Sequence, residues 1–222
     1  MGNMQDLLYN SSYIGERPDI QKLIPSNAEF ILDIGCSTGV LGSDIKKMTG
    51  ARVYGIEISE EMANLAKERI DKVFVGDVES VIKSNELLAC KFDVIIFADI
   101  LEHLVDPWKV LRLAVSRLND NGVIVASIPN VRHLSTIFSL VFKGYWPYRE
   151  RGLHDRTHLR FFTKRNTIEL FKYADLKIDV INANYRLFDK CYRINCLARF
   201  FAAFGMRNFM AYQYLIKAHK GK

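Results

Sequence analysis

Apolar and polar positions follow one another along the first 130 residues as short apolar runs separated by longer amphipathic stretches. The apolar runs, which are typical of buried strands, lie at residues 30–34, 52–57, 73–75, 92–97 and 123–128. The amphipathic stretches, which predict helices, lie at residues 18–24, 40–48, 60–70, 78–85 and 107–118. Strands that alternate with helices in this way predict an α/β fold, with a parallel sheet covered by helices on both faces.

Beyond residue 130 the pattern is less regular. A helix or an apolar loop is expected over residues 133–142, and an aromatic loop follows over 144–148. Later we expect a short strand at 160–163, a helix at 164–174, a strand at 176–182, a helix at 192–204 and a closing strand at 212–218. The length suits one domain. We divide it into an N-terminal lid or helix (1–28), a core that binds the cofactor (29–130), an insertion on the substrate side (131–163) and C-terminal helices and strands (164–222).

The loop after the first strand carries the clearest chemistry. Asp33, Gly35 and Gly39 occur where a strand gives way to a helix, and Glu57 ends the second strand. Glycines let the backbone approach a ligand closely, and an acid at the end of the second strand can bind two ribose hydroxyls. The glycine spacing does not match the dinucleotide fingerprint. Asp33 instead suits a cationic ligand, which it can hold directly or through water.

This loop resembles the first motif of the class I S-adenosylmethionine-dependent methyltransferases, acid-x-Gly-x-Gly-x-Gly. Here the motif reads Asp33-x-Gly35-x-Ser37-x-Gly39, with serine replacing the middle glycine, a change that matters where that position needs a positive φ angle. The resemblance implies a Rossmann-like, mostly parallel sheet of seven strands, with helices on both faces and an antiparallel last strand between strands five and six. It also implies S-adenosylmethionine as cofactor and S-adenosylhomocysteine as product. The expected cofactor-binding residues are Asp33, Gly35, Cys36, Ser37, Gly39, Glu57, Ile58, Asp77, Val78, Asp99 and Ile100.

Two further stretches narrow the resemblance. Residues 92–107, with a Leu-Glu-His-Leu-x-Asp-Pro run, are similar to the strand-four region of ubiquinone-biosynthesis O-methyltransferases. Residues 152–163 are similar to a Thr-His segment of methyltransferases from glycan and lipid biosynthesis. The second stretch offers His158, His154 and Asp155 as catalytic candidates, because histidine suits proton removal near neutral pH. The alternative is that His158 only packs in the sheet, and that His103 only hydrogen-bonds the backbone.

Composition and charge refine the expected partners. Net charge is +6, but residues 143–222 hold 17 basic and 6 acidic residues, a net +11, with additional arginines at 149, 151, 156 and 160. An anionic, small or carrier-linked acceptor fits this surface, as does peripheral contact with a membrane, whereas a solvated basic face needs no partner. We expect no DNA partner, no membrane-spanning segment and a possible homodimer. Four cysteines without a C-x-x-C pair fit a reduced, cytoplasmic setting.

The sequence therefore predicts an enzyme that transfers a methyl group from S-adenosylmethionine, most readily to a hydroxyl oxygen, with nitrogen or carbon as alternatives. A protein that binds the cofactor without transferring the methyl group is a second interpretation. A third is an RNA or protein methyltransferase that docks through its basic C-terminal segment. No metal ion is expected, because Asp99, Asp155 and His158 lack a carboxylate-rich or H-x-x-E pattern around them.

Overall fold

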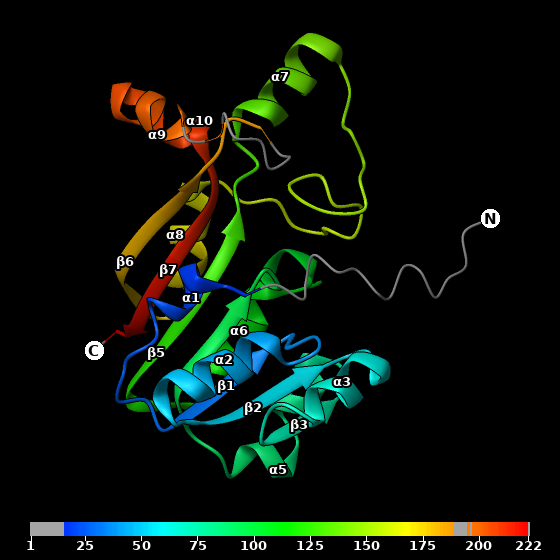
Figure 1. Cartoon of the computed structure of the whole chain (residues 1–222), viewed down its shortest axis with the longest axis vertical. Coiled ribbons are helices and arrows are strands. Elements are labelled where there is room, and N and C mark those ends of the chain that lie inside the picture. The colour runs from blue at the N-terminus through cyan, green and yellow to red at the C-terminus, as the bar shows by residue number, and fades with distance from the viewer. Residues whose placement is uncertain (1–15, 189–194, 196, 222) are drawn as a thin grey trace, which may run out of the picture.

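One sheet of seven strands organises the chain. The computed structural model describes residues 16–188, 195 and 197–221. The strand order is β3-β2-β1-β4-β5-β7-β6 (Figure 1). The strands are β1 (Phe30–Ile34), β2 (Arg52–Glu57), β3 (Lys72–Val75), β4 (Phe92–Ala98), β5 (Leu118–Pro129), β6 (Leu176–Tyr185) and β7 (Ala211–Lys220). β7 is antiparallel to both its neighbours, and β1 to β5 are parallel. The predicted fold class is thereby confirmed.

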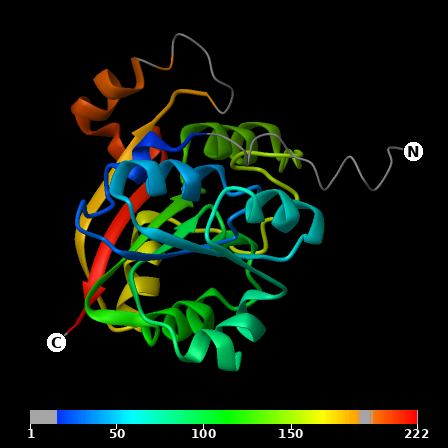
Figure 2. The same cartoon turned by 60° about the horizontal axis from the view of Figure 1, so that its bottom comes forward.

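Helices cover both faces of the sheet (Figure 2). On one face lie α1 (Pro18–Gln21), α2 (Val40–Thr49) and α3 (Glu60–Lys67). On the other lie α4 (Val78–Ile82), α5 (Asn85–Leu88), α6 (Pro107–Val115) and α8 (Lys164–Tyr173). The remaining helical segments are a short 3-10 helix (Leu101–His103), α7 (Leu134–Lys143), α9 (Ala198–Phe201), a π-helical turn (Ala202–Met206) and α10 (Arg207–Met210).

The two hydrophobic cores explain why the central strands read as continuous apolar runs. In β1, Ile31 belongs to the core beneath α1 to α3, and Leu32 belongs to the core beneath α4, α5, α6 and α8. Both side chains are fully buried. A strand covered on both faces needs apolar residues at successive positions, which removes the simple alternation of a half-exposed strand.

Three expectations need correction. The helix expected over 78–85 breaks in two, because the Ser84 hydroxyl accepts a hydrogen bond from the backbone N–H of Leu87 and starts α5. The strand expected over 160–163 is reduced to one bridge between Asn130 and Phe162. The helix expected over 192–204 lies partly outside the described residues, and the helical segment that is described continues to Met210. Of the two alternatives left open for residues 133–142, the helix is the one that forms, over Leu134–Lys143.

The loop between β1 and α2 has three residues with positive φ. Gly35 and Gly39 have φ angles of +72° and +76°, and Ser37 has a φ of +48°. A Cβ atom on Gly39 would also lie 3.0 Å from the Cα of Ala66. The serine in the middle of the motif therefore adopts the left-handed conformation that its glycine counterpart would adopt without strain.

Replacing Ser37 by glycine should raise the free energy of unfolding by about 0.5–1 kcal/mol, because glycine relieves the left-handed strain. Urea denaturation would measure the change. Ser43→Gly, inside α2 where φ is helical, is the matched control and should lower stability by about 0.5–1 kcal/mol. Shifts of the same sign in the two variants would contradict the assignment of strain to Ser37.

Candidate active site

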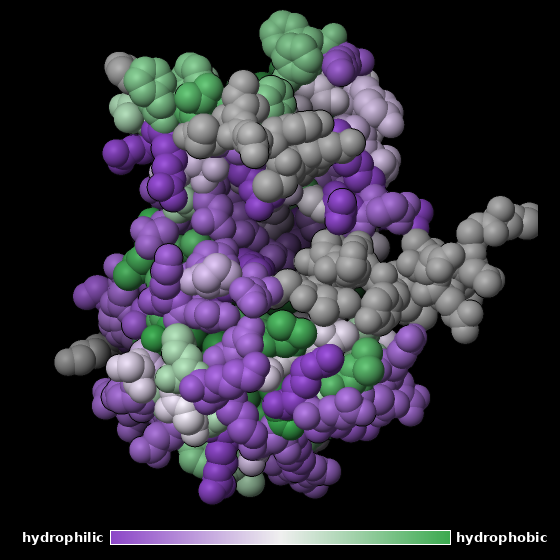
Figure 3. Space-filling model, viewed as in Figure 1, coloured by the Kyte–Doolittle hydropathy of each residue, from purple (hydrophilic) through white to green (hydrophobic). Residues whose placement is uncertain are grey.

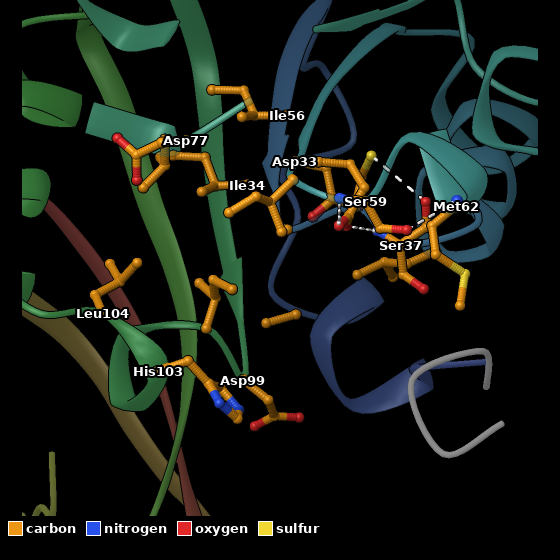
Figure 4. Close-up of a pocket in the computed structure, with 18 of the residues that line it drawn as sticks. Asp33, Ile34, Ser37, Ile56, Ser59, Met62, Asp77, Asp99, His103 and Leu104 are labelled. Atoms are coloured by element: carbon orange, nitrogen blue, oxygen red, sulfur yellow. Dashed lines mark hydrogen bonds between the residues drawn. The ribbon is translucent and has the colours of Figure 1, made fainter. Parts of the chain in front are cut away.

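A cavity of about 540 Å³ lies at the carboxyl ends of β1, β2 and β4, where the strand order reverses and open α/β sheets bind their ligands. Asp33 and Ser37 lie on one side of it, Asp77 lies on the other, and His103 and Asp99 lie beside each other at one end (Figure 4). Ten of the eleven residues predicted to bind the cofactor line this cavity: Asp33, Gly35, Cys36, Ser37, Glu57, Ile58, Asp77, Val78, Asp99 and Ile100. Gly39 instead begins α2 behind the loop.

Glu57 joins the two loops that border the cavity. One carboxylate oxygen accepts the backbone N–H of Ser37 at 2.8 Å, and the other accepts that of Ser59 at 2.9 Å. Each oxygen keeps a further lone pair that can accept a hydrogen bond from a ribose hydroxyl. The predicted ribose contact therefore has a carboxylate already fixed in orientation.

Asp33 is an acid buried at the floor of the cavity, and its side chain is almost inaccessible to water. Burial raises the pKa of its carboxyl to about 7, the negative charge of Glu57 adds to this effect, and Arg17 opposes it. A cationic group that enters the cavity would favour the ionised form. Asp33 is thus suited to the ammonium group that its sequence position suggested.

Asp77, Ile58 and Val78 are three more of the predicted cofactor-binding residues that line the cavity. Asp77 caps α4 by accepting the backbone N–H of Ser80 at 3.1 Å, and its carboxylate borders the cavity. The side chain of Ile58 is 74% exposed, whereas that of Val78 is buried. The expected roles of Asp77, Ile58 and Val78 in binding the cofactor stay predictions.

Cys36 and Ile100 shape the loop by packing. A Cβ atom on Gly55 would lie 2.4 Å from the Cys36 sulfur, and one on Gly35 would lie 2.8 Å from the Ile100 side chain. Burial raises the pKa of the Cys36 thiol, so the sulfur stays protonated. Cys36 is therefore a small apolar filler.

Asp99 is the centre of a polar network at the end of the cavity. One of its oxygens accepts Arg17 Nη1 at 2.5 Å, and the other accepts the Ser127 hydroxyl at 2.9 Å. Gln213 of β7 donates to the same carboxylate. The sequence did not reveal Arg17 or Gln213, because nothing in their local patterns marks two residues 196 positions apart as neighbours.

A second cavity of about 870 Å³ adjoins the first and shares Arg17, Asp99 and His103 with it. Its other polar lining residues include Glu102, Asp155, His158, Tyr185, Tyr212 and the arginines at 149, 151, 186 and 199. Two adjoining cavities with a common wall of polar side chains suit a reaction in which a group moves from one ligand to another.

His103 stands in the common wall, held by a short hydrogen-bonded chain. The Thr157 hydroxyl donates to Asp155 at 2.6 Å and lies 3.0 Å from His103 Nδ1. Nδ1 therefore carries the ring proton and donates to Thr157, which leaves a lone pair on Nε2. Burial lowers the pKa of His103, although Asp155 opposes the shift, so the ring is neutral near pH 7.

Glu102 and His158 lie next to His103. The rings of His103 and His158 are 4.7 Å apart between centroids, and His158 Nε2 is 3.9 Å from Glu102 Oε1. Burial lowers the pKa of His158 to about 4, and His103 adds to this. Burial also raises the pKa of Glu102 well above its usual value, with Asp99 contributing.

The two other predicted catalytic residues have different surroundings. His154 is buried, its Nε2 lies 3.1 Å from the Thr136 hydroxyl, and its ring packs against Trp146. It lines neither of the two cavities. Asp155 is also buried, but it lines the second cavity and orients His103 through Thr157. Of the two, only Asp155 is near the common wall.

Of the four additional arginines, Arg149 and Arg151 line the second cavity. Arg156 instead pairs with Glu150 at 2.9 Å, and Arg160 donates to the Val105 carbonyl. Two arginines that the sequence did not single out also line it: Arg186, directly after β6, and Arg199 on α9. The same lining holds the carboxylates of Glu16, Asp19, Asp99, Glu102, Glu150 and Asp155.

Three side chains at the common wall have the composition of a metal site. Ligand atoms of Glu102, His103 and His158 all lie within 4.8 Å of one another. Glu102 Oε2 is buried, and no protein group in the described part of the chain donates a hydrogen bond to it. Neutral imidazoles and a carboxylate are ligands for divalent zinc, manganese or iron. These three residues could therefore hold such an ion.

Comparison with known proteins identifies the family. Residues 17–180 match a family described as a methyltransferase domain. The match covers most of the chain, so the chain belongs to this family and is a class I S-adenosylmethionine-dependent methyltransferase by fold and site. S-adenosylmethionine is the cofactor of the family, and the cavity above β1, β2 and β4 is where the fold places it.

Two relatives are ubiquinone biosynthesis O-methyltransferases. The mitochondrial protein of Saccharomyces cerevisiae is 31% identical over 118 residues, which cover 51% of this chain and 38% of the relative. The protein of Coxiella burnetii is 26% identical over 143 residues, which cover 61% of this chain and 59% of the relative. The chain thus spans less than two thirds of either relative. A methyltransferase structure from Archaeoglobus fulgidus superposes with a TM-score of 0.66 at 19% identity, over 98% of this chain and all of the other, which shows a shared fold.

The raised pKa of Asp33 predicts a pH-dependent affinity for the cofactor. Because the ionised carboxyl attracts the ammonium group, the affinity for S-adenosylhomocysteine should fall about tenfold per pH unit below about pH 7 and be constant above it. Calorimetric titration between pH 5 and about pH 8 would measure this. Asp33→Asn should bind weakly with no such dependence, and a wild-type affinity unchanged down to pH 5 would contradict the role of Asp33.

Glu57→Ala should weaken binding of S-adenosylhomocysteine by about 1–3 kcal/mol, because a charged hydrogen-bond acceptor is removed. Isothermal titration would measure the change. Glu61→Ala, on the neighbouring helix α3 and outside the lining, is the control and should leave the affinity unchanged. Equal affinities of wild type and Glu57→Ala would rule out the ribose contact.

Proposed function

We propose that this protein transfers the methyl group of S-adenosylmethionine to a hydroxyl oxygen of a small or carrier-linked acceptor that carries an anionic group. The observation that supports this most directly is the pair of adjoining cavities, which share Asp99, His103 and Arg17 as a wall. Ten of the eleven residues predicted to bind the cofactor line the first cavity, and polar side chains line the second. The similarity to ubiquinone biosynthesis O-methyltransferases favours oxygen as the atom that is methylated.

The transfer requires removal of a proton from the hydroxyl. His103 is better placed for this than His158, which the sequence favoured, because it lines both cavities. The acceptor O–H would give its proton to Nε2 of His103 while the oxygen bonds to the methyl carbon. The bond from carbon to sulfur breaks, and the sulfonium becomes the neutral thioether of S-adenosylhomocysteine. Asp155, acting through Thr157, stabilises the imidazolium that forms.

The anionic group is supported by the arginines of the second cavity. Arg151, Arg186 and Arg199 come from three separate segments and converge on the same lining. No carboxylate in the described part of the chain forms an ion pair with any of them. Guanidinium groups bind phosphates and carboxylates through paired hydrogen bonds. A phosphorylated or nucleotide-linked acceptor therefore fits this cavity better than a neutral one.

The experiment that tests the function is turnover with S-adenosylmethionine labelled in its methyl group. The acceptor panel would begin with sugar nucleotides and phenols, each paired with an uncharged analogue. We expect the labelled methyl group to be transferred to the charged acceptors of the panel and to be located on an oxygen atom. Cofactor binding without transfer to any acceptor would favour a protein that binds the cofactor without catalysis. Transfer confined to RNA or to a protein would contradict the small acceptor.

His103→Ala should lower kcat by about 10²- to 10⁴-fold, the usual contribution of a general base, while the affinity for S-adenosylhomocysteine stays within about twofold. Single-turnover kinetics with the best acceptor would measure it. His219→Ala is the matched control, because His219 pairs with Asp179 on the exposed surface between β6 and β7. If His158→Ala lost far more activity than His103→Ala, the base would be His158.

A divalent ion at Glu102, His103 and His158 is the second way to activate the hydroxyl, and it is favoured by their close ligand atoms. Dialysis against a chelator separates the two mechanisms. An enzyme that keeps its rate uses histidine as the base. One that loses its rate and regains it with added zinc or manganese uses the metal.

A further inference from the structure

Helix α7 buries polar side chains and exposes apolar ones, which is the opposite of the usual arrangement for a helix on a protein surface. Its two buried residues are Thr136 and Ser139, both polar. Four of its apolar residues are instead exposed, among them Phe142 at 74% and Val141 at 68%. Phe138 and Leu140 are exposed as well. The side of a surface helix that faces water normally carries polar residues.

Hydrogen bonds hold α7 in this orientation. The Ser139 hydroxyl donates to the Tyr145 carbonyl at 2.7 Å, and the Thr136 hydroxyl lies 3.1 Å from His154 Nε2. Both partners belong to the loop that follows the helix. Rotation of α7 to hide its apolar side would break these buried hydrogen bonds, so the exposed apolar side is built into the fold.

A second apolar protrusion lies at the same end of the molecule. On α9 and the residue before it, Leu197, Phe200 and Phe201 are exposed, and Tyr145 and Tyr148 are exposed in the loop after α7. Figure 3 shows apolar surface gathered where Figure 1 places α7 and α9. Leu134 at the start of α7 packs against the small core of α9 and α10. We call the exposed apolar residues of these segments the apolar rim: Phe138, Leu140, Val141, Phe142, Tyr145, Tyr148, Leu197, Phe200 and Phe201.

Basic side chains accompany the rim. Arg132 precedes α7, Lys143 ends it, and Arg207 begins α10, and all three are exposed. Among the described residues of the rim segments, 132–152 and 197–210, the one acid is Glu150, which pairs with Arg156. Exposed aromatic and aliphatic residues with interspersed cations are the pattern of segments that lie in the interface of an anionic bilayer.

We propose that the apolar rim docks onto a lipid bilayer with anionic headgroups, with its aromatic side chains in the interface and its cations on the headgroups. The charge on the rim disfavours a second copy as the occupant, because a two-fold interface would bring the basic residues of both copies together. No helix in the described part of the chain is long and apolar enough to cross a membrane. The contact is therefore peripheral.

Docking in this way would bring a bilayer next to the second cavity. Arg151 lies three positions after Tyr148, and Arg199 precedes Phe200, so residues of the cavity and of the rim share two segments. An acceptor held in the membrane by an apolar tail could present its head group to the site without leaving the bilayer.

Vesicle flotation of the full chain tests the proposal. Vesicles of phosphatidylglycerol mixed with phosphatidylcholine should bind the wild-type protein, and pure phosphatidylcholine should bind it more weakly. The double variant Phe138→Ser/Phe142→Ser should lose about tenfold or more in partition coefficient, because two exposed apolar anchors are removed. Met48→Ser/Leu88→Ser, which alters two comparably exposed residues on α2 and α5, is the control and should bind as wild type does.

A matched pair of charge variants tests the electrostatic part. Arg132→Gln/Lys143→Gln/Arg207→Gln should lose binding to the anionic vesicles. Lys22→Gln/Lys67→Gln/Lys164→Gln makes the same change in net charge away from the rim and should retain binding. Binding of S-adenosylhomocysteine by every variant checks the fold.

Two results would overturn the proposal. The first is a partition coefficient on anionic vesicles that is no greater for the wild-type protein than for the Phe138→Ser/Phe142→Ser variant. The other is a dimer of the wild-type protein in sedimentation that the same variant converts to monomer, because the rim would then be covered by a second copy.

Discussion

The chemistry of this protein depends on carboxylates that the fold buries at one edge of its sheet. Asp33, Glu102 and Asp155 are each at most 3% exposed, and Asp99 lies among them. Burial penalises the charged form of each acid, and neighbouring acids raise the cost further. Arg17 compensates part of this charge through Asp99. Of these acids, Asp33 and Asp99 line the cofactor cavity. A ligand with a sulfonium and an ammonium group would place positive charge beside them and offset part of this electrostatic cost.

The strand order explains why these acids meet. Asp33 lies in β1, and Asp99 and Glu102 follow β4, the two strands that flank the point where the order reverses. The carboxyl ends of parallel strands share one edge, so Asp33 and Asp99, which are 66 positions apart in sequence, face the same cavity. β7 then brings Gln213 to Asp99 from the opposite end of the chain. The antiparallel strand thereby ties the cofactor cavity to the wall of the second cavity.

The sequence predicted what local patterns encode and missed what only tertiary contacts create. The strand ends at Asp33, Glu57 and Asp77 were readable, because each acid follows an apolar run at the carboxyl end of a strand. Ser37 was recognised as a departure from the motif, and the structure shows the positive φ that makes it matter. Arg17 and Gln213 carry no local signal. Likewise, the sequence left open that His103 only hydrogen-bonds the backbone. Its position in the wall shared by the two cavities is what distinguishes it from His154.

Tertiary contacts also decide the orientation of α7, for which the sequence left a helix and an apolar loop as alternatives. Its apolar residues have helical spacing, which in a soluble domain predicts a side buried in the core. The structure buries the opposite side, because Thr136 and Ser139 find hydrogen-bond partners in the loop that carries His154 and Tyr145. Periodicity reveals that a helix has two different sides but not which side meets the protein. That choice depends on partners distant in sequence, and here it leaves the apolar side for a partner outside the chain.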